Sequence, residues 1–363
     1  MLVSLLTPPG RGAIAVLHVC GDGAGALVRR LFPGEFGDRP VPGRLESGGE
    51  PLDEVMVRSA EGFTGEETVE VSCHGGAAAV ERVMKAFEAL GARRAGAAEL
   101  LERGVETGHL DRIRAEAWTL LPRAVTGLAA RVLADQAAGA LSRAVEGLGS
   151  VAGAERLLAT SVLGIALASP RKVVLAGAPN VGKSTLFNAL VRADRAIVSP
   201  EPGTTRDPVR ETIAIEQVPL ELVDTAGVGA PRGLLEQLSE ERTARMLREA
   251  DLILFLFDAE AGARGEELRF LERLAGRRVL LLVNKTDAGD KKPLLDSIPV
   301  SALTGDGLDR VRRMILHALD IRPRAEPGGP VVFTARQQRL LLGAVTGRAS
   351  IEESRRGLLR GPA

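Results

Sequence analysis

The pattern of hydrophobic and polar residues changes twice along this chain. In the first 110 residues, short apolar stretches alternate with turns rich in glycine and proline, and residues 76–90 have apolar side chains at helical spacing. Residues 110–167 are rich in Ala, Leu and Arg at helical periodicity, with Pro122 as the only breaker. Strand and helix patterns then alternate in residues 169–320, which predicts a mainly parallel sheet covered by helices on both faces. The apolar stretches of the first part are residues 3–6, 13–19, 55–57 and 69–71.

These patterns predict a multidomain chain that combines α+β and α/β folds. We expect an N-terminal α+β domain at residues 1–110, and a helical domain formed by residues 111–168 together with 331–363. A nucleotide-binding domain at residues 169–322 is then inserted between the two helical stretches. The Pro- and Gly-rich residues 323–330 form a linker.

Composition narrows the class of protein. A chain of 363 residues is long enough for two or three domains and a large core. Lys plus Arg and Asp plus Glu both total 47, so any contact with nucleic acid must come from a local basic patch. Cys20 and Cys73 give neither a zinc-binding spacing nor a disulfide framework, and Cys73 is expected to be a small buried hydrophobe rather than a nucleophile. The N-terminus is too short and uncharged for a signal peptide and no run of about 18 apolar residues occurs, which predicts a cytoplasmic protein without a membrane span.

The most informative motif is Gly-Ala-Pro-Asn-Val-Gly-Lys-Ser at residues 177–184, which follows the apolar strand pattern Lys-Val-Val-Leu-Ala. Gly177 and Gly182 permit backbone angles that let successive N–H groups converge on phosphate oxygens, and the start of the next helix adds its positive dipole end. Lys183 supplies a positive charge at the β and γ phosphates, and the Ser184 hydroxyl is placed to hold Mg²⁺. The motif therefore predicts a phosphate-binding loop.

Three later signals follow in the order that a GTPase requires. A strand pattern ends at Asp224, which can hold the Mg²⁺ shell, and Gly227 can offer its N–H to the γ-phosphate. A second apolar strand ends in Asn284-Lys285-Thr286-Asp287, where a carboxylate can accept both N–H groups of guanine and so exclude adenine. Residues 298–300 then lead to Ser301 and Ala302, the short loop expected beneath the base. Together these signals predict a guanine-nucleotide-binding domain.

The nucleotide domain resembles the potassium-activated GTPases. Val228 stands where many small GTPases carry the glutamine that orients the attacking water. Asn180 in the phosphate loop and the segment 196–207, which contains Gly-Thr-Thr-Arg-Asp, are similar to that group. In the potassium-activated GTPases this segment wraps a K⁺ ion, which takes the place of an arginine finger.

The N-terminal motifs resemble the MnmE (TrmE) family of tRNA-modification GTPases. They are Thr-Pro-Pro-Gly-Arg-Gly at 7–12, Phe-Thr-Gly-Glu-Glu at 63–67, Val-Glu-Val at 69–71 and His-Gly-Gly at 74–76. The resemblance implies GTP hydrolysis coupled to modification of wobble uridine (U34) of tRNA, with GTP, Mg²⁺ and K⁺, a homodimer and an MnmG-type flavoprotein partner. It implies no membrane.

The resemblance also implies roles for particular residues. Lys183, Thr205 and Glu236 would be catalytic, with Glu236 positioning water through an intermediate water. The K⁺ ligands would be Ser199, Glu201 and Thr204 with Asn180, and Mg²⁺ would be held by Ser184, Thr205 and Asp224. The nucleotide contacts would be Asn180, Val181, Gly182, Lys183, Ser184, Thr185, Asp224, Gly227, Asn284, Lys285, Asp287, Ser301 and Ala302.

The sequence also departs from the family pattern. Relatives that modify tRNA end in a Cys-containing segment, whereas this chain ends in residues 358–363 without cysteine. The family's pocket for a 5,10-methylene- or formyl-tetrahydrofolate would use Glu70, with His18 and His109 where the family has Arg and Lys, so the pocket is expected to be weakened. His18 is equally consistent with an ordinary strand residue, and His109 with a surface residue. The alternative function is therefore a shortened relative that acts as a GTP-dependent switch or binding module without modification chemistry.

Overall fold

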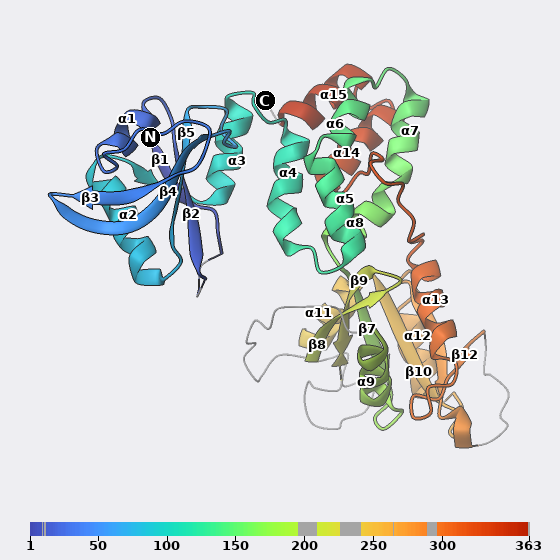
Figure 1. The fold of residues 1–363 in the computed structure, drawn as a ribbon. Coiled ribbons are helices and arrows are strands. Elements are labelled where there is room, and N and C mark those ends of the chain that lie inside the picture. Colours follow the sequence, from blue (N-terminus) through green and yellow to red (C-terminus); the bar gives the residue numbers. More distant parts are fainter. Residues whose placement is uncertain are drawn as a thin grey trace. The chain divides into compact units, whose positions relative to one another are not determined.

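The computed structural model describes residues 1–8, 10, 12–194, 209–225, 241–263, 265–288 and 296–361. The chain divides into two compact units, which are treated separately below and are coloured along the sequence in Figure 1. The first unit comprises Met1–Leu120, Gln136–Gly147 and Arg355–Ala363, and the second comprises Leu121–Asp135 and Leu148–Ser354.

The first unit is built on a sheet whose described strands run in the order β3-β4-β5-β2-β1-β6. Neighbouring strands are antiparallel except β1 and β6, which are parallel. The four expected apolar stretches each overlap one of these strands. The strands are β1 Leu2–Leu5, β2 Ile14–Cys20, β3 Val41–Ser47, β4 Glu50–Ala60, β5 Thr68–His74 and β6 Arg93–Arg94.

Two helices bury one face of this sheet. Helix α1 (Ala24–Arg29) contributes Val28 and helix α2 (Ala77–Ala89) contributes Phe87 to a core that contains alternate residues of the central strands, such as Leu17 and Val71. Because side chains alternate between the faces of a strand, His18 and Glu70 belong to the opposite face. The unit is completed by helices α3 (Ala97–Glu106), α4 (Arg112–Leu120) and α6 (Ala140–Glu146).

Every described regular element between residues 112 and 168 is helical, which confirms the helical pattern read from the sequence. Pro122 lies in the short 3₁₀ turn Leu121–Arg123 that separates α4 from α5, as expected for a helix breaker. The two compact units share these helices, so the boundaries of a separate helical domain stay a prediction. The remaining helices are α5 Gly127–Ala137, α7 Val151–Ala159, α8 Ser161–Ala168, α14 Ala335–Val345 and α15 Ile351–Arg360.

Among the described residues, no single helix is both long enough and apolar enough to cross a membrane. Helices α7 and α8 reach that length and composition only as a pair bent by 43°.

The second unit contains the α/β sheet that the sequence predicts, with strand order β12-β11-β10-β7-β9-β8 among the described residues. All its neighbours are parallel except β8 and β9, so the sheet is mainly parallel. Its strands are β7 Arg171–Gly177, β8 Val209–Ile215, β9 Val218–Asp224, β10 Leu252–Asp258, β11 Val279–Asn284 and β12 Ile298–Pro299.

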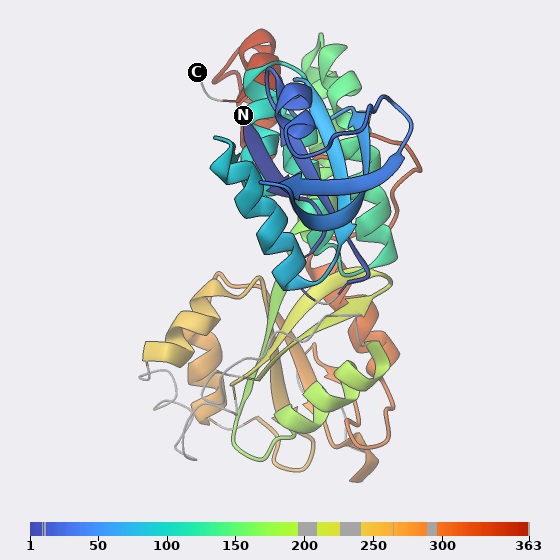
Figure 2. The same cartoon turned by 60° about the vertical axis from the view of Figure 1, so that its left-hand side comes forward.

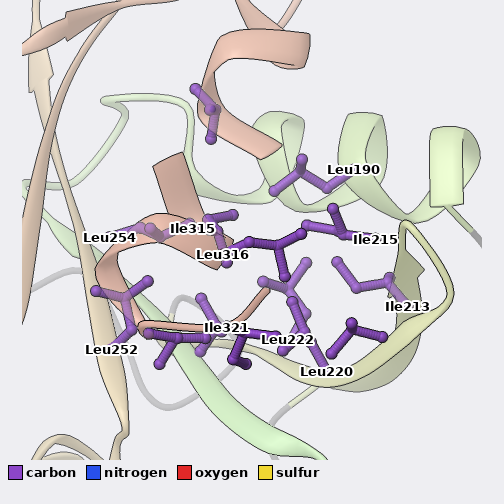
Figure 3. Packing of buried hydrophobic residues seen from close by; sticks show 14 of the residues in the cluster. Leu190, Ile213, Ile215, Leu220, Leu222, Leu252, Leu254, Ile315, Leu316 and Ile321 are labelled. Carbon is purple, nitrogen blue, oxygen red and sulfur yellow. The ribbon is translucent and has the colours of Figure 1, made fainter. Parts of the chain in front are cut away.

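Helices cover both faces of this sheet, and Figure 2 shows gold helices on one side of it and the green α9 on the other. Leu190 and Ile315 come from the helices of one face and pack with Leu222 and Leu254 of the sheet (Figure 3). On the other face Phe270 packs among Phe255 and its neighbours. The helices are α9 Lys183–Asp194 and α13 Leu308–Ala318 on the first face, and α11 Glu241–Glu249 and α12 Gly265–Arg273 on the second.

This topology positions the site. In a parallel sheet covered on both faces, the carboxyl ends of the strands lie along one edge, which is where such folds bind ligands. Strands β7, β9, β10 and β11 end at Gly177, Asp224, Asp258 and Asn284. Three of these four residues were predicted to contact the nucleotide or to shape its loop.

Candidate guanine-nucleotide site

The phosphate loop connects the end of β7 to the start of α9. Gly177 and Gly182 both have positive φ angles, +142° and +96°, and a Cβ at Gly182 would lie 2.2 Å from Asn284 Nδ2. Asn180, which is exposed, also adopts a left-handed backbone with φ of 63°. The loop therefore has the backbone that the two glycines were predicted to permit, and it is packed tightly against the end of β11.

Lys183 is buried in the first turn of α9, and Ser184 and Thr185 beside it are exposed. Its Nζ donates hydrogen bonds to the carbonyl oxygens of Gly177 and Ala178, at 2.9 and 2.8 Å. Burial lowers the pKa of Lys183, and the charge of Asp224 opposes this shift. The ammonium group thus lies on the loop whose amides would hold the phosphates, and its predicted contact with the phosphates stays a prediction.

The predicted Mg²⁺ ligands Ser184 and Asp224 meet in the structure. The Ser184 hydroxyl donates to Asp224 Oδ2 at 2.7 Å, and Asp224 is held at the end of β9. The adjacent Thr225 hydroxyl donates to Leu175 O at 2.8 Å and ties the end of β9 to β7. A hydroxyl and a carboxylate side by side at the helix start fit Mg²⁺, which prefers oxygen ligands and is usually shared with phosphates.

Asn284 connects the phosphate loop with the loop predicted to lie beneath the base. Its Nδ2 donates to Val181 O at 2.8 Å, and its Oδ1 accepts from the backbone N–H of Ala302 at 2.9 Å. The residue is almost fully buried, so both of its polar ends need these partners. Asn284 therefore fixes the distance between the two loops before any ligand binds.

Asp287, the predicted guanine-reading carboxylate, is oriented by a buried hydroxyl. Ser301 Oγ donates to Asp287 Oδ1 at 2.6 Å and accepts from Thr304 N at 3.1 Å. Asp287 itself lies in a short 3₁₀ turn, Thr286–Ala288, and this bond engages one of its two carboxylate oxygens. Ser301 and Ala302 thus both contact the predicted guanine-specific segment, residues 284–287, and their place beneath a base stays a prediction.

One residue of the site was not predicted. Asp258, at the end of β10, accepts a hydrogen bond from Lys285 Nζ at 2.7 Å and another from Glu260 N at 2.8 Å. Burial acts to raise the pKa of Asp258, but the bonds from Lys285 and the backbone lower it below its ordinary value. An acidic residue directly after the apolar run 252–257 is the same sequence signal that identified Asp224, and it could have been read in the same way.

Several predicted residues lie outside the described part of the chain. They include the catalytic candidate Glu236, and the structure neither confirms nor contradicts their roles. The full set is Ser199, Glu201, Thr204, Thr205, Gly227 and Glu236.

The predicted N-terminal pocket residues His18 and Glu70 are cross-strand partners on β2 and β5. His18 Nε2 lies 3.5 Å from Glu70 Oε2, and burial lowers the pKa of His18. Arg58 of β4, which was not predicted, donates from Nε and Nη2 to Glu70 Oε1 and Oε2 at 2.7 and 3.0 Å. These bonds lower the pKa of Glu70. His109 is exposed and lies against Gly65, where an added Cβ would come within 2.5 Å of His109 Cβ.

Cys73, expected to be structural, is buried on the helix-covered face of the same sheet. Burial, with a smaller effect from Asp53, raises the pKa of its thiol to about 11. A thiol with such a pKa carries almost no thiolate at neutral pH, so it is a poor nucleophile.

Comparison with known proteins gives two family matches. The family described as "GTP-binding protein TrmE N-terminus" matches residues 1–109, and the family described as "50S ribosome-binding GTPase" matches residues 172–285. The second match contains the phosphate loop, Asp224, Asp258 and the beginning of the guanine-specific segment.

Relatives that match over most of the chain carry the name tRNA modification GTPase MnmE. The protein of Thermus thermophilus is 33% identical over 97% of this chain and 89% of its own length. That of Moorella thermoacetica is 33% identical over 94% of this chain and 86% of its own length. That of Chloroflexus aurantiacus is 35% identical over 88% of this chain and 81% of its own length.

Proposed function

Because this chain belongs to the MnmE family of tRNA modification GTPases and is a GTP hydrolase, we propose that K⁺ activates its hydrolysis of GTP and that hydrolysis drives modification of wobble uridine (U34). One observation supports the GTP hydrolysis on which this proposal is built: the phosphate loop, the Ser184–Asp224 pair and the Asp287–Ser301 pair lie at the carboxyl-end edge of the sheet. A site of this composition binds GTP with Mg²⁺ and has little covalent chemistry to perform, so catalysis depends on positioning and on charge.

K⁺ supplies the missing positive charge in this proposal. Asn180 is exposed in the phosphate loop with a left-handed backbone, and it would hold the ion together with Ser199, Glu201 and Thr204. A cage of backbone carbonyls that fits K⁺ is too wide for the smaller Na⁺ ion. Hydrolysis should therefore be much faster in KCl than in NaCl at equal ionic strength. Asn180→Ala should bring the two rates together. Equal rates in the two salts with the unaltered protein would contradict the role of K⁺.

Glu236 would position the attacking water, since Val228 has no group that can do so. We expect Glu236→Ala to abolish turnover of GTP while the dissociation constant for GTP stays within a small factor. Single-turnover hydrolysis and titration of a fluorescent GTP analogue measure the two quantities separately. An unchanged kcat in the variant would remove Glu236 from the mechanism.

A specific observation keeps the second function open, namely a GTP-dependent switch without modification chemistry. Glu70 is already paired with Arg58, and burial lowers the pKa of His18 and so favours its neutral form. The predicted pocket therefore offers little free charge to the glutamate tail of a tetrahydrofolate. We expect 5-formyl-tetrahydrofolate to bind weakly, because its ring system must compete with Arg58 for Glu70. Calorimetric titration of the purified protein measures this, and tight binding by the unaltered pocket would contradict it.

Mass spectrometry of tRNA from a deletion strain separates the two functions. Loss of the wobble-uridine modification, restored by the wild-type chain and not by Glu236→Ala, would support the modification function with an MnmG-type flavoprotein as partner. An unchanged modification profile would favour the switch. Light scattering of the full chain tests the homodimer that the same proposal includes.

A further inference from the structure

Two strand ends bring Asp258 and Lys285 together. Asp258 ends β10 and pairs in register with Asn284, the last residue of the neighbouring parallel strand β11. The backbone N–H of Ala259 also donates to Asn284 O at 2.9 Å, so the two chains are joined one residue beyond the ladder. Lys285 follows with a left-handed backbone, φ of 67°, which is uncommon for a residue other than glycine.

Each oxygen of the Asp258 carboxylate has its own partner. Oδ1 accepts from the backbone N–H of Glu260 at 2.8 Å, and Oδ2 accepts from Lys285 Nζ at 2.7 Å. The backbone contact fixes the carboxylate on its own chain, so the orientation of the carboxylate dictates where the lysine side chain lies. Lys285 lies between Asn284 and Asp287 in the sequence, and each of these two residues is held by other partners. Asn284 is bonded to Val181 and Ala302. Asp287 is bonded to Ser301.

We propose that Asp258 is a positioning residue that holds the Lys285 side chain in the conformation that receives a guanine nucleotide. This inference rests on the guanine-nucleotide site described above. A partly exposed ion pair contributes little to folding, so stability alone is a poor reason for this contact. A lysine that is already held in place loses less side-chain entropy when a ligand binds, so the dissociation constant of the ligand is lower.

The test compares Asp258→Ala with a matched ion pair of the same unit. Glu249 pairs with Lys172 at 3.0 Å near the opposite end of the sheet, and it also accepts from Arg245 Nε at 2.7 Å. The side chains of Glu249 and Lys172 are 42% and 21% exposed, against 21% and 42% for Asp258 and Lys285. We expect Asp258→Ala to raise the dissociation constant for GDP about five- to tenfold, and Glu249→Gln to leave it unchanged. The loss should fall on KM for GTP more than on kcat.

A double-mutant cycle with Lys285→Met distinguishes positioning from a general loss of structure. In the Lys285→Met background, Asp258→Ala should have no further effect on GDP affinity. If its effect persists there, or if it lowers only the melting temperature while GDP affinity is unchanged, the inference is wrong. Failure of the unaltered chain to bind GDP would instead remove the nucleotide site itself.

Discussion

Gly182 gives the sharpest test of how the phosphate loop and the guanine-specific segment are joined. In Gly182→Ala the new methyl group would lie 2.2 Å from Asn284 Nδ2, at a backbone φ of +96°. Asn284 is buried and has no open space to retreat into without breaking its bonds to Val181 O and Ala302 N. The substitution therefore strains the loop and also detaches the residue that spaces the two loops.

Two contributions set the size of the effect. Placing alanine in a left-handed conformation costs about 1–2 kcal/mol. Leaving buried polar groups of Val181, Asn284 and Ala302 without partners adds roughly 2–4 kcal/mol. Gly276→Ala isolates the first contribution, because Gly276 has φ of +81° and nothing within 4 Å of its would-be Cβ. Both substitutions restrict the unfolded chain equally, so that effect cancels between them.

Scanning calorimetry of the full chain measures the difference. The transition that shifts upon addition of GDP reports on this unit, since a ligand stabilises the part that binds it. We expect Gly182→Ala to lower that melting temperature by roughly 5–15 °C more than Gly276→Ala does, from about 2–4 °C per kcal/mol in a unit of this size. It should also weaken GDP binding, whereas Gly276→Ala should not. Equal shifts for the two variants would refute the contact between Gly182 and Asn284.

Three further predictions concern single side chains. Burial lowers the pKa of His18, so around that pH the unfolded chain binds more protons at this residue than the folded chain does. The first unit should therefore lose stability as the pH falls below about 6.5, and His18→Gln should remove this dependence. His74 shows the opposite sign, because the hydrogen bond that it donates to the Asp53 carboxylate raises its pKa. Its stabilisation is therefore full below about pH 6.5 and is lost at higher pH, and His74→Gln should lower the melting temperature more at pH 5.5 than at pH 8.5. Identical pH profiles for the variants and the wild type would contradict both signs. Ser301→Ala frees Asp287 and should raise the dissociation constant for GDP about fivefold while ATP is still excluded; unaltered GDP affinity in a titration would show that Asp287 needs no such support.

The buried strands of the nucleotide domain, and the motifs that follow them, could be predicted because the apolar pattern specifies those strands. Strands β7, β9 and β11 are almost continuous apolar runs, which is the pattern of strands buried on both faces. Strand β3 was missed because Leu45 is its only fully buried residue, and the rest of Val41–Ser47 looks like a turn-rich loop. Strand β4 was predicted from Val55 to Val57 only, whereas it extends over Glu50–Ala60 with mostly polar or exposed ends.

The residues of the site could be predicted where a short sequence motif, such as residues 177–184, has a single chemical use. They could not be predicted where a contact depends on how two strands are aligned. Arg58 was missed for the second reason, and although the position of Asp258 at a strand end could be read from the sequence, its contact with Lys285 could not. The contact of Arg58 with Glu70 depends on the register of β4 against β5, and that of Asp258 with Lys285 on the register of β10 against β11. A shift of one residue in either pairing would turn the side chain to the other face of the sheet.

Three aspartates of the nucleotide domain show how neighbours decide function. Asp224, Asp258 and Asp287 all follow buried strands at the same edge of one sheet. A serine hydroxyl from the start of α9 donates to Asp224, a lysine to Asp258, and a buried serine to Asp287. Ser184 leaves the Asp224 carboxylate able to share a metal ion. Lys285 balances the charge of Asp258, and Ser301 orients Asp287 without balancing its charge. Exchanging these roles would require different neighbouring side chains and not different aspartates. The residue that donates to each aspartate therefore determines, more than the aspartate does, what each position does.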